Sequence, residues 1–243
     1  MADAKGGEEV NPLNPKGDRE AVLARITEAL REEAPLHHEK PEKPAPAGLT
    51  APFREWLPPV GKSRKEQIAL FAQQSEALRT EFLECPSVAA AAKHIAGLAA
   101  VFGWKSIALH AGKLTDAIAE RLPETLTLLR VDGGYEKEAL EACDAGFTEC
   151  ETLVAQTGSV CVTGRSSGGR ALSVLPPHHI AIASKEQMVT DLAAAYELLA
   201  QKYQGNYPSF ISFITGPSRT GDIERILVLG AHGPKKLTVL LVP

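Results

Sequence analysis

The densest group of chemically versatile residues lies at 215–224, directly after a predicted strand at 210–214. Glycines at the carboxyl end of a strand let backbone N–H groups approach a ligand, and hydroxyl and guanidinium groups bind anions. The candidate anion-binding residues are Gly216, Ser218, Arg219 and Thr220, and the candidate catalytic acid–base residues are Asp222 and Glu224. The alternative is a connecting turn in which Asp222 caps a helical turn.

Two earlier glycine-containing loops are candidates for the same site. Thr157, Gly158 and Ser159 precede an apolar run, and Arg170 ends a Gly–Ser loop. The planar fork of arginine suits carboxylate and phosphate. An ordinary turn and a solvated loop are the alternatives. Because parallel strands deliver successive loops to one edge, we expect these residues to meet 218–224 in one pocket at the carboxyl ends of the strands.

A histidine is the third kind of candidate. His232 stands between glycines in 230–234 and is a candidate catalytic proton carrier, since imidazole titrates near neutral pH. The alternative is a hydrogen-bonded turn residue. His178 and His179 follow two prolines, and we expect them to be structural.

The four cysteines lack the spacing of a zinc or iron–sulfur site, so we expect neither a metal nor a cofactor in this chain. The net charge of −4 gives no reason to expect nucleic-acid binding. The chain opens without a signal peptide and has no apolar run of roughly 20 residues. These features predict a cytoplasmic protein with no membrane span.

The elements that must position these residues alternate between strand and helix. Strands are expected at 106–109, 126–131, 160–163, 179–183, 210–214, 226–229 and 237–242, and helices at 18–33, 113–121 and 136–143 and after Ser63, Ser87 and Ser184. The alternation predicts an α/β fold with a mostly parallel, Rossmann-like sheet flanked by helices. The short link at 230–236 predicts a C-terminal β-hairpin of the last two strands at the sheet edge.

The chain is expected to divide at residue 61. Residues 1–17 are rich in Gly, Pro and charge, and seven prolines between 34 and 61 exclude long regular elements. We therefore predict an N-terminal helix and Pro-rich flexible arm over 1–61 and one α/β domain over 62–243. Ser63 with Glu66 forms the capping box expected at the start of that domain.

The motifs together resemble a known family. The stretches 214–224 and 228–234 resemble the C-terminal signature of the lactate-utilisation protein C family, whose members carry a LUD domain, and 156–159 and 169–177 resemble two further family blocks. The resemblance covers roughly residue 63 to the C-terminus. It implies a fold related to the sugar-phosphate isomerases and coenzyme A transferases. Gln156 stands where an acidic residue is expected, which weakens the case for a carboxylate base there.

The resemblance also implies a function. The chain would be a component of a multi-protein system that oxidises L-lactate to pyruvate with two iron–sulfur partner proteins, and it would bind a small carboxylate or phosphate-like anion. The iron–sulfur clusters would belong to the partners. Two alternatives stay open at this point. One is a free-standing enzyme on a phosphorylated or acyl substrate, and the other is a non-catalytic scaffold that docks redox partners through its Pro-rich arm and Trp56.

Overall fold

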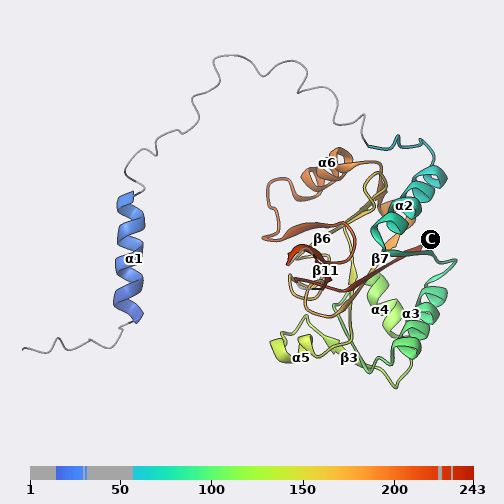
Figure 1. Cartoon of the computed structure of the whole chain (residues 1–243), viewed down its shortest axis with the longest axis horizontal. Coiled ribbons are helices and arrows are strands. Elements are labelled where there is room, and N and C mark those ends of the chain that lie inside the picture. Colours follow the sequence, from blue (N-terminus) through green and yellow to red (C-terminus); the bar gives the residue numbers. More distant parts are fainter. Residues whose placement is uncertain (1–14, 30, 32–56, 224–225, 231) are drawn as a thin grey trace, which may run out of the picture. The chain divides into compact units, whose positions relative to one another are not determined.

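The computed structural model describes residues 15–29, 31, 57–223, 226–230 and 232–243 (Figure 1). The chain divides into two compact units between Arg54 and Glu55, and each is treated by itself. The helices of the described part are all too short or too polar to cross a membrane.

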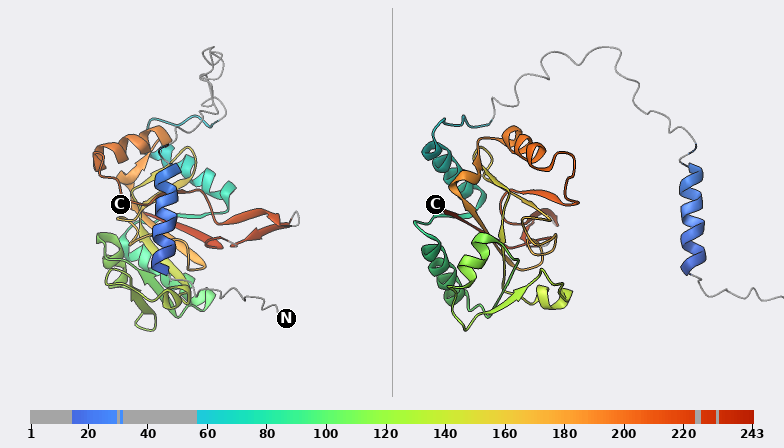
Figure 2. Two further views of the ribbon diagram at one scale, coloured as in Figure 1. Left: turned by 90° about the vertical axis from the view of Figure 1, so that its left-hand side faces the viewer. Right: turned by 180° about the vertical axis from the view of Figure 1, so that it is seen from behind.

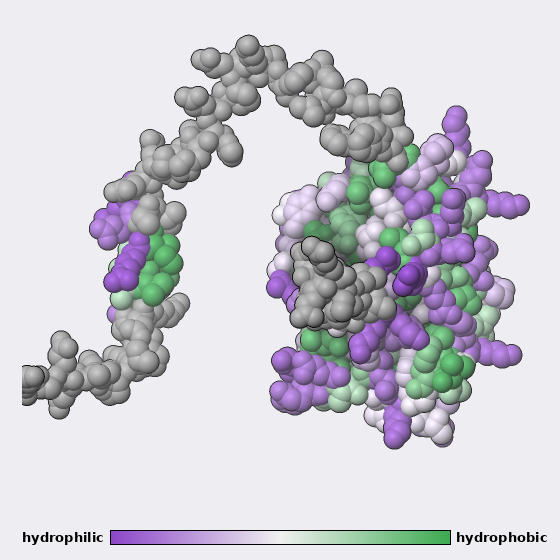
Figure 3. Space-filling model, viewed as in Figure 1, coloured by the Kyte–Doolittle hydropathy of each residue, from purple (hydrophilic) through white to green (hydrophobic). Residues whose placement is uncertain are grey.

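The first unit contains helix α1, Pro15–Ala29. Residues 15–17 are therefore helical, although the sequence analysis places them in an irregular segment. Val22, Leu23 and Ile26 are exposed on this helix, and one of its sides is green and apolar in Figure 3. The remaining predictions for 1–14 and 34–56 fall outside the described residues.

The second unit is built on a six-stranded sheet in which every neighbouring pair is parallel. Its order is β1 (Glu81–Glu84), β12 (Lys236–Val242), β7 (His178–Ser184), β4 (Ala145–Glu149), β2 (Ser106–Leu109) and β3 (Thr127–Arg130). This confirms the mostly parallel sheet. In β7 and in β12 alike, six of the seven residues are buried, as expected of strands covered on both faces.

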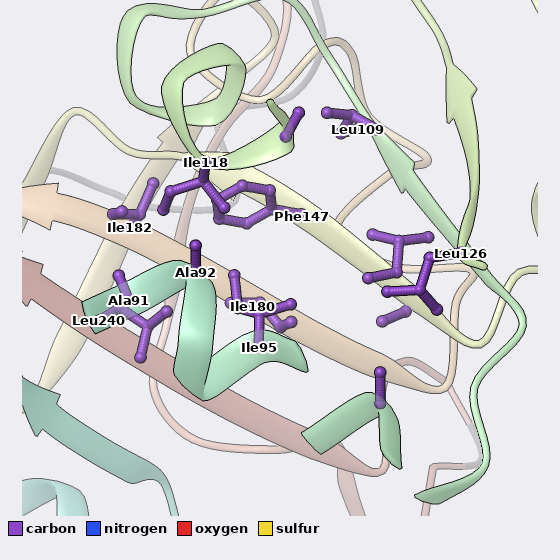
Figure 4. Close-up of a cluster of buried hydrophobic side chains, with 14 of the residues drawn as sticks. Ala91, Ala92, Ile95, Leu109, Ile118, Leu126, Phe147, Ile180, Ile182 and Leu240 are labelled. Carbon is purple, nitrogen blue, oxygen red and sulfur yellow. The ribbon is translucent and has the colours of Figure 1, made fainter. Parts of the chain in front are cut away.

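Helices α3 (Val88–Phe102) and α4 (Lys113–Ala119) cover one face of this sheet. Helix α3 begins where predicted, because the Ser87 hydroxyl accepts a hydrogen bond from the Ala90 N–H. Figure 4 shows side chains of both helices packed on those of the strands. This layer includes Ala91, Ile95, Ile118, Phe147, Ile180 and Leu240.

A second, four-stranded sheet covers the opposite face. Its order is β8 (Met188–Val189), β5 (Thr152–Val154), β6 (Ser159–Thr163) and β9 (Ile211–Ile214). The layer between the two sheets includes Phe71, Leu153, Val160, Ala181 and Val239. Phe71 comes from helix α2 (Arg64–Leu78), and helix α6 (Leu192–Tyr203) packs on β6 and β9 through Leu199 and Tyr203. The short helix α5 (Lys137–Glu141) packs through Leu140 beside Ala108 of β2.

The C-terminal hairpin is formed by different strands from those expected. Strand β10 (Arg219–Ile223) pairs antiparallel with β11 (Ile226–Leu229). Strand β12 does not pair with β11 but lies between β1 and β7. The physical reason is its apolar character, since residues 237–242 are all buried and an edge strand would expose one side of them.

The helix expected after Ser184 also begins later. Ser184 and Gln187 do form a capping box, but it closes only the 3₁₀ turn Lys185–Gln187. Met188 then pairs with Leu153 in the second sheet. Helix α6 begins after Asp191, whose carboxylate accepts a hydrogen bond from the Ala194 N–H.

Candidate functional site

A cleft of about 340 Å³ lies between strand β9 and the first residues of β7 and β12. It is lined by Ser173, Val174, His179, Phe210, Ser212, Ile214, Thr215, Gly216, Pro217, Ser218, Arg219, His232, Gly233, Pro234 and Leu237. Four of the predicted site residues, Gly216, Ser218, Arg219 and His232, therefore share one cavity. Gly216 and Ser218 come from the loop after β9, and Arg219 is the first residue of β10. His232 lies in the segment that leads into β12.

The cleft does not lie where the sequence analysis expects it. His179 and Leu237 are the second residues of β7 and β12, so the cleft lies at the amino ends of these parallel strands. The four residues thus meet at the opposite ends of these two strands from the carboxyl ends that the sequence analysis expects. The reason is that β9 belongs to the second sheet, where it pairs antiparallel with β6, and its own carboxyl end faces the start of β7 and β12.

The mouth of the cleft is cationic. Arg219 is exposed, and its guanidinium donates a hydrogen bond to the carbonyl of Leu78, the last residue of α2. The carboxyl end of a helix carries partial negative charge, which favours a cation at this position. Aspartate and glutamate are absent from the described residues that line the cleft. The electrostatics of these residues therefore favour an anion.

The floor of the cleft is polar but uncharged. Ser173 and His179 are both buried, and the Ser173 Oγ and His179 Nδ1 atoms have no hydrogen-bond partner in the described part of the chain. The other ring nitrogen of His179 lies 2.9 Å from Thr148 Oγ1. Burial, together with the nearby His178, lowers the pKa of His179 to about 3, so its ring is neutral at physiological pH. The sequence analysis assigns His179 a structural role and does not single out Ser173.

Thr157, Gly158 and Ser159 lie beside the cleft and are not among its described lining residues. A chain of hydroxyl groups joins them to it, with 2.7 Å between Thr157 Oγ1 and Ser159 Oγ and 2.8 Å between Ser159 Oγ and Thr215 Oγ1. This segment therefore contacts the loop after β9 through Ser159 and Thr215 without lining the cleft itself.

The glycines of the two segments pack on the end of α2. Gly158 has φ +65° and Gly216 has φ +89°, a conformation that other residues rarely adopt. A Cβ on Gly158 would lie 2.8 Å from Gln74 Cβ, and one on Gly216 would lie 3.1 Å from the Leu78 carbonyl oxygen. Close helix packing thus explains both glycines without a ligand.

Arg170 lies in a neighbouring depression. Its guanidinium donates a hydrogen bond of 3.3 Å to the Ser209 carbonyl and lies 5.5 Å from the centre of the Phe210 ring. Phe210 lines both this depression and the cleft. Arg170 lines the depression and is not among the described residues that line the cleft. The structure does not bring Arg170 together with Arg219.

Two further predicted residues, Thr220 and Asp222, belong with Arg219 to strand β10 of the β10–β11 hairpin. Glu224 lies outside the described residues. Figure 2 shows the hairpin projecting from the body of the domain. Asp222 is three residues beyond Arg219 toward the turn, which corresponds to about 10 Å along an extended strand. The acid–base roles of Asp222 and Glu224 stay predictions.

Glu151 is a buried carboxylate that no sequence motif predicts. Its oxygens accept hydrogen bonds from Lys202 Nζ at 2.5 Å, from the Tyr203 hydroxyl at 2.5 Å and from the Thr163 hydroxyl at 2.7 Å. Burial acts to raise the pKa of Glu151, but these hydrogen bonds outweigh it and hold the pKa below its usual value. The network ties α6 to the second sheet. Its donors lie at distant sequence positions, so no local motif predicts it.

Among the described residues, His, Cys, Asp and Glu side chains do not gather in groups of three or more that are able to hold a metal ion. The four cysteines are buried and form no disulfide with one another. The absence of a metal or cofactor in this chain stays a prediction.

Comparison with known proteins identifies a matching family and similar sequences. The sequence model of the LUD domain matches residues 68–242, a range that contains every described residue lining the cleft. A lactate utilization protein C from Anoxybacillus flavithermus is 30% identical over 92% of this chain and 98% of its own length. The protein of that name from Shouchella clausii is 30% identical over 74% of this chain and 80% of its own length.

A solved structure shows the same fold. It is the crystal structure of a DUF162 family protein from Deinococcus radiodurans, which aligns with a TM-score of 0.59 and 22% sequence identity. The alignment covers 75% of this chain and all of that chain. At this level of identity the likeness supports the fold alone.

Proposed function

The chain belongs to the LUD domain family, and we propose that it takes part in lactate utilisation by binding a small carboxylate in the cleft between β9 and the start of β7 and β12. The names of its relatives support the process. The observation that carries the ligand class is the cleft itself, with Arg219 at its mouth and no acidic residue among its described lining residues.

The cleft offers donors suited to a carboxylate. A guanidinium has five N–H donors in a planar fork, and the bond to Leu78 uses one nitrogen of Arg219. The hydroxyl of Ser218 is a further donor from the same loop. Charge-assisted hydrogen bonds are about twice as strong as neutral ones. The carboxylate is therefore proposed to lie toward Arg219 and Ser218.

Binding alone does not oxidise lactate. The conversion of a 2-hydroxy acid to a 2-oxo acid releases two electrons and two protons. We propose that two iron–sulfur proteins, as partners of this chain, accept the electrons. His232 lines the cleft and is exposed, so it is the proposed relay that passes the two released protons, one at a time, to solvent.

The ligand class is tested by calorimetric titration of the full chain with L-lactate, pyruvate and inorganic phosphate. Arg219→Gln should weaken binding of both carboxylates by about tenfold, the cost of one lost charge-assisted hydrogen bond. Arg170→Gln is a matched control, because Arg170 is also exposed and also donates to a backbone carbonyl. Its effect should stay below about twofold. Phosphate binding without carboxylate binding would instead favour an enzyme for phosphorylated substrates.

The partners are tested separately. A tagged chain should be purified under anaerobic conditions from its native cell, and the proteins that accompany it identified by mass spectrometry. We expect two iron–sulfur proteins in constant ratio to the chain. Purification of the chain alone at physiological salt would contradict a stable complex and leave the carboxylate site intact.

A further inference from the structure

The floor of the cleft contains two buried polar atoms, Ser173 Oγ and His179 Nδ1, that lack a partner among the described residues. Buried polar groups in folded proteins are nearly always hydrogen-bonded, to protein or to an ordered occupant. Two such atoms whose residues line one cavity are therefore candidates for ligand contacts. Nothing in the function proposed above uses either of them.

Local packing explains why Ser173 and His179 line one cleft. Gly146 of β4 and His179 of β7 are register partners in the parallel sheet. A Cβ on Gly146 would lie only 2.2 Å from the carbonyl oxygen of Leu172. The absence of that Cβ lets the buried segment around Leu172 lie directly on β4. Ser173, the next residue, thereby lines the same cleft as His179.

We propose that Ser173 and His179 bind the hydroxyl oxygen of a 2-hydroxycarboxylate and so select 2-hydroxy acids over simple carboxylates. This inference rests on the proposed function of the cleft as a carboxylate site. The ligand would span the cleft, with its carboxylate toward Arg219 and its hydroxyl group on the floor. The two residues are specificity determinants of the cleft, and the inference assigns them no proton transfer.

The chemistry of the two groups matches a hydroxyl. A serine hydroxyl donates one hydrogen bond and accepts others, and a neutral imidazole presents one donor and one acceptor nitrogen. With Nε2 of His179 paired to Thr148, its Nδ1 is the nitrogen left for a ligand. An alcohol group both donates and accepts, so it can satisfy both atoms at once. A carboxylate, which only accepts, is better placed at the cationic mouth.

The test compares L-lactate with propionate, which has the same carboxylate and carbon chain but no hydroxyl group. Calorimetric titration of the full wild-type chain should show L-lactate binding at least about tenfold more tightly, because a site built to bond a hydroxyl rejects the analogue that lacks it. Ser173→Ala and His179→Gln should each lower lactate affinity by about tenfold and leave propionate affinity unchanged.

Two control variants distinguish the effect of substitutions on the floor of the cleft from the effect of substitutions elsewhere. Ser75→Ala also removes a buried hydroxyl without a described partner, but Ser75 lies in α2 and outside the lining of the cleft, so it should preserve the preference. Arg219→Gln should weaken both acids by the same factor. If His179→Gln does not fold, Ser173→Ala decides the question alone, since it removes only one oxygen atom.

The outcomes distinguish the two proposals. Equal binding of lactate and propionate by the wild type would overturn this inference and leave the carboxylate site standing, with water as the occupant of the floor. A preference that survives both Ser173→Ala and His179→Gln would also overturn it. Failure of the wild type to bind either acid would overturn the proposed function and this inference together.

Discussion

At the scale of single residues, His179 should make the stability of the fold depend on pH. Burial lowers its pKa to about 3, whereas an unfolded histidine titrates near 6.5. Between these values the unfolded chain binds a proton that the folded chain does not. The contribution of neutral His179 is thus fully present above pH 6.5. It is lost as the pH falls, by up to about 1.4 kcal/mol per pH unit.

Urea unfolding at pH 7, 6 and 5 measures this effect. The free energy of unfolding should fall less steeply with decreasing pH in His179→Gln than in the wild type. His232→Gln is the control, because His232 is exposed, and it should keep the wild-type slope. Identical slopes for wild type and His179→Gln would contradict a neutral buried imidazole.

Some side-chain hydrogen bonds join residues far apart in the sequence, and no local pattern predicts them. Gln156 stands where the family resemblance predicts an acidic residue. In the structure its amide donates a hydrogen bond of 3.0 Å to the Pro58 carbonyl, a bond that an ionised carboxylate cannot donate. The partner lies in the Pro-rich segment, far away in sequence. A pairing of this kind has no local signature, and the same holds for Glu151 with Lys202.

At the scale of elements, local signals predict helix starts well. The Ser63–Glu66 capping box forms and opens α2. The box at Ser184 and Gln187 forms too, yet only one 3₁₀ turn follows, because Met188 gains a strand partner in Leu153. Tertiary pairing thus overrides the local signal. Strand β4 is not predicted from the sequence because its Ala, Gly and Glu weaken the strand signal of Phe147 and Thr148, and burial between β2 and β7 stabilises it instead.

The packing of α2 on the turn before β6 gives a prediction at this scale. Gly158→Ala should lower the free energy of unfolding by about 1–3 kcal/mol, because it forces a side chain into a left-handed conformation and against Gln74 Cβ. Gly97→Ala is the matched control in helix α3. A Cβ there meets nothing within 4 Å, so the substitution should stabilise the protein by about 0.5–1 kcal/mol.

Urea unfolding followed by far-ultraviolet circular dichroism compares the two variants with the wild type. Opposite signs are expected for Gly158→Ala and Gly97→Ala. A Gly158→Ala variant as stable as the wild type would mean that the packing of α2 on this turn adjusts to a larger side chain at little cost. It would contradict the view that the turn is a rigid support for the loop after β9.

At the scale of the whole molecule, the fold class follows from the alternation of helices and strands, but the place of the site does not. The cleft depends on a second sheet whose strands β5 and β8 are only three and two residues long. Its position over the start of β7 and β12 is set by the antiparallel pairing of β9 with β6. Such pairings between distant segments leave no periodic pattern in the sequence. Sequence reasoning therefore predicts four of the residues that line the cleft but expects them at the carboxyl ends of the strands, not at the amino ends of β7 and β12.

The boundary between the two units gives the last prediction. The compact unit of the domain begins at Glu55, whereas the sequence analysis places the boundary after residue 61. Three described residues between these points contact the rest of the domain. Pro58 accepts the hydrogen bond from Gln156, Val60 packs against the core between the sheets, and the Gly61 carbonyl lies 3.4 Å from Gln67 Nε2. These residues should therefore contribute to the stability of the domain.

Two truncated chains test this contribution. A chain of residues 55–243 should unfold in urea with a free energy within about 0.5 kcal/mol of the full chain and bind L-lactate with the same affinity. A chain of residues 62–243 should be less stable by about 1–3 kcal/mol, because Gln156 loses its partner and part of the core loses the cover of Val60. Equal stability of the two truncated chains would place the boundary at residue 61. A marked loss in the chain of residues 55–243 would instead mean that the first unit supports the domain.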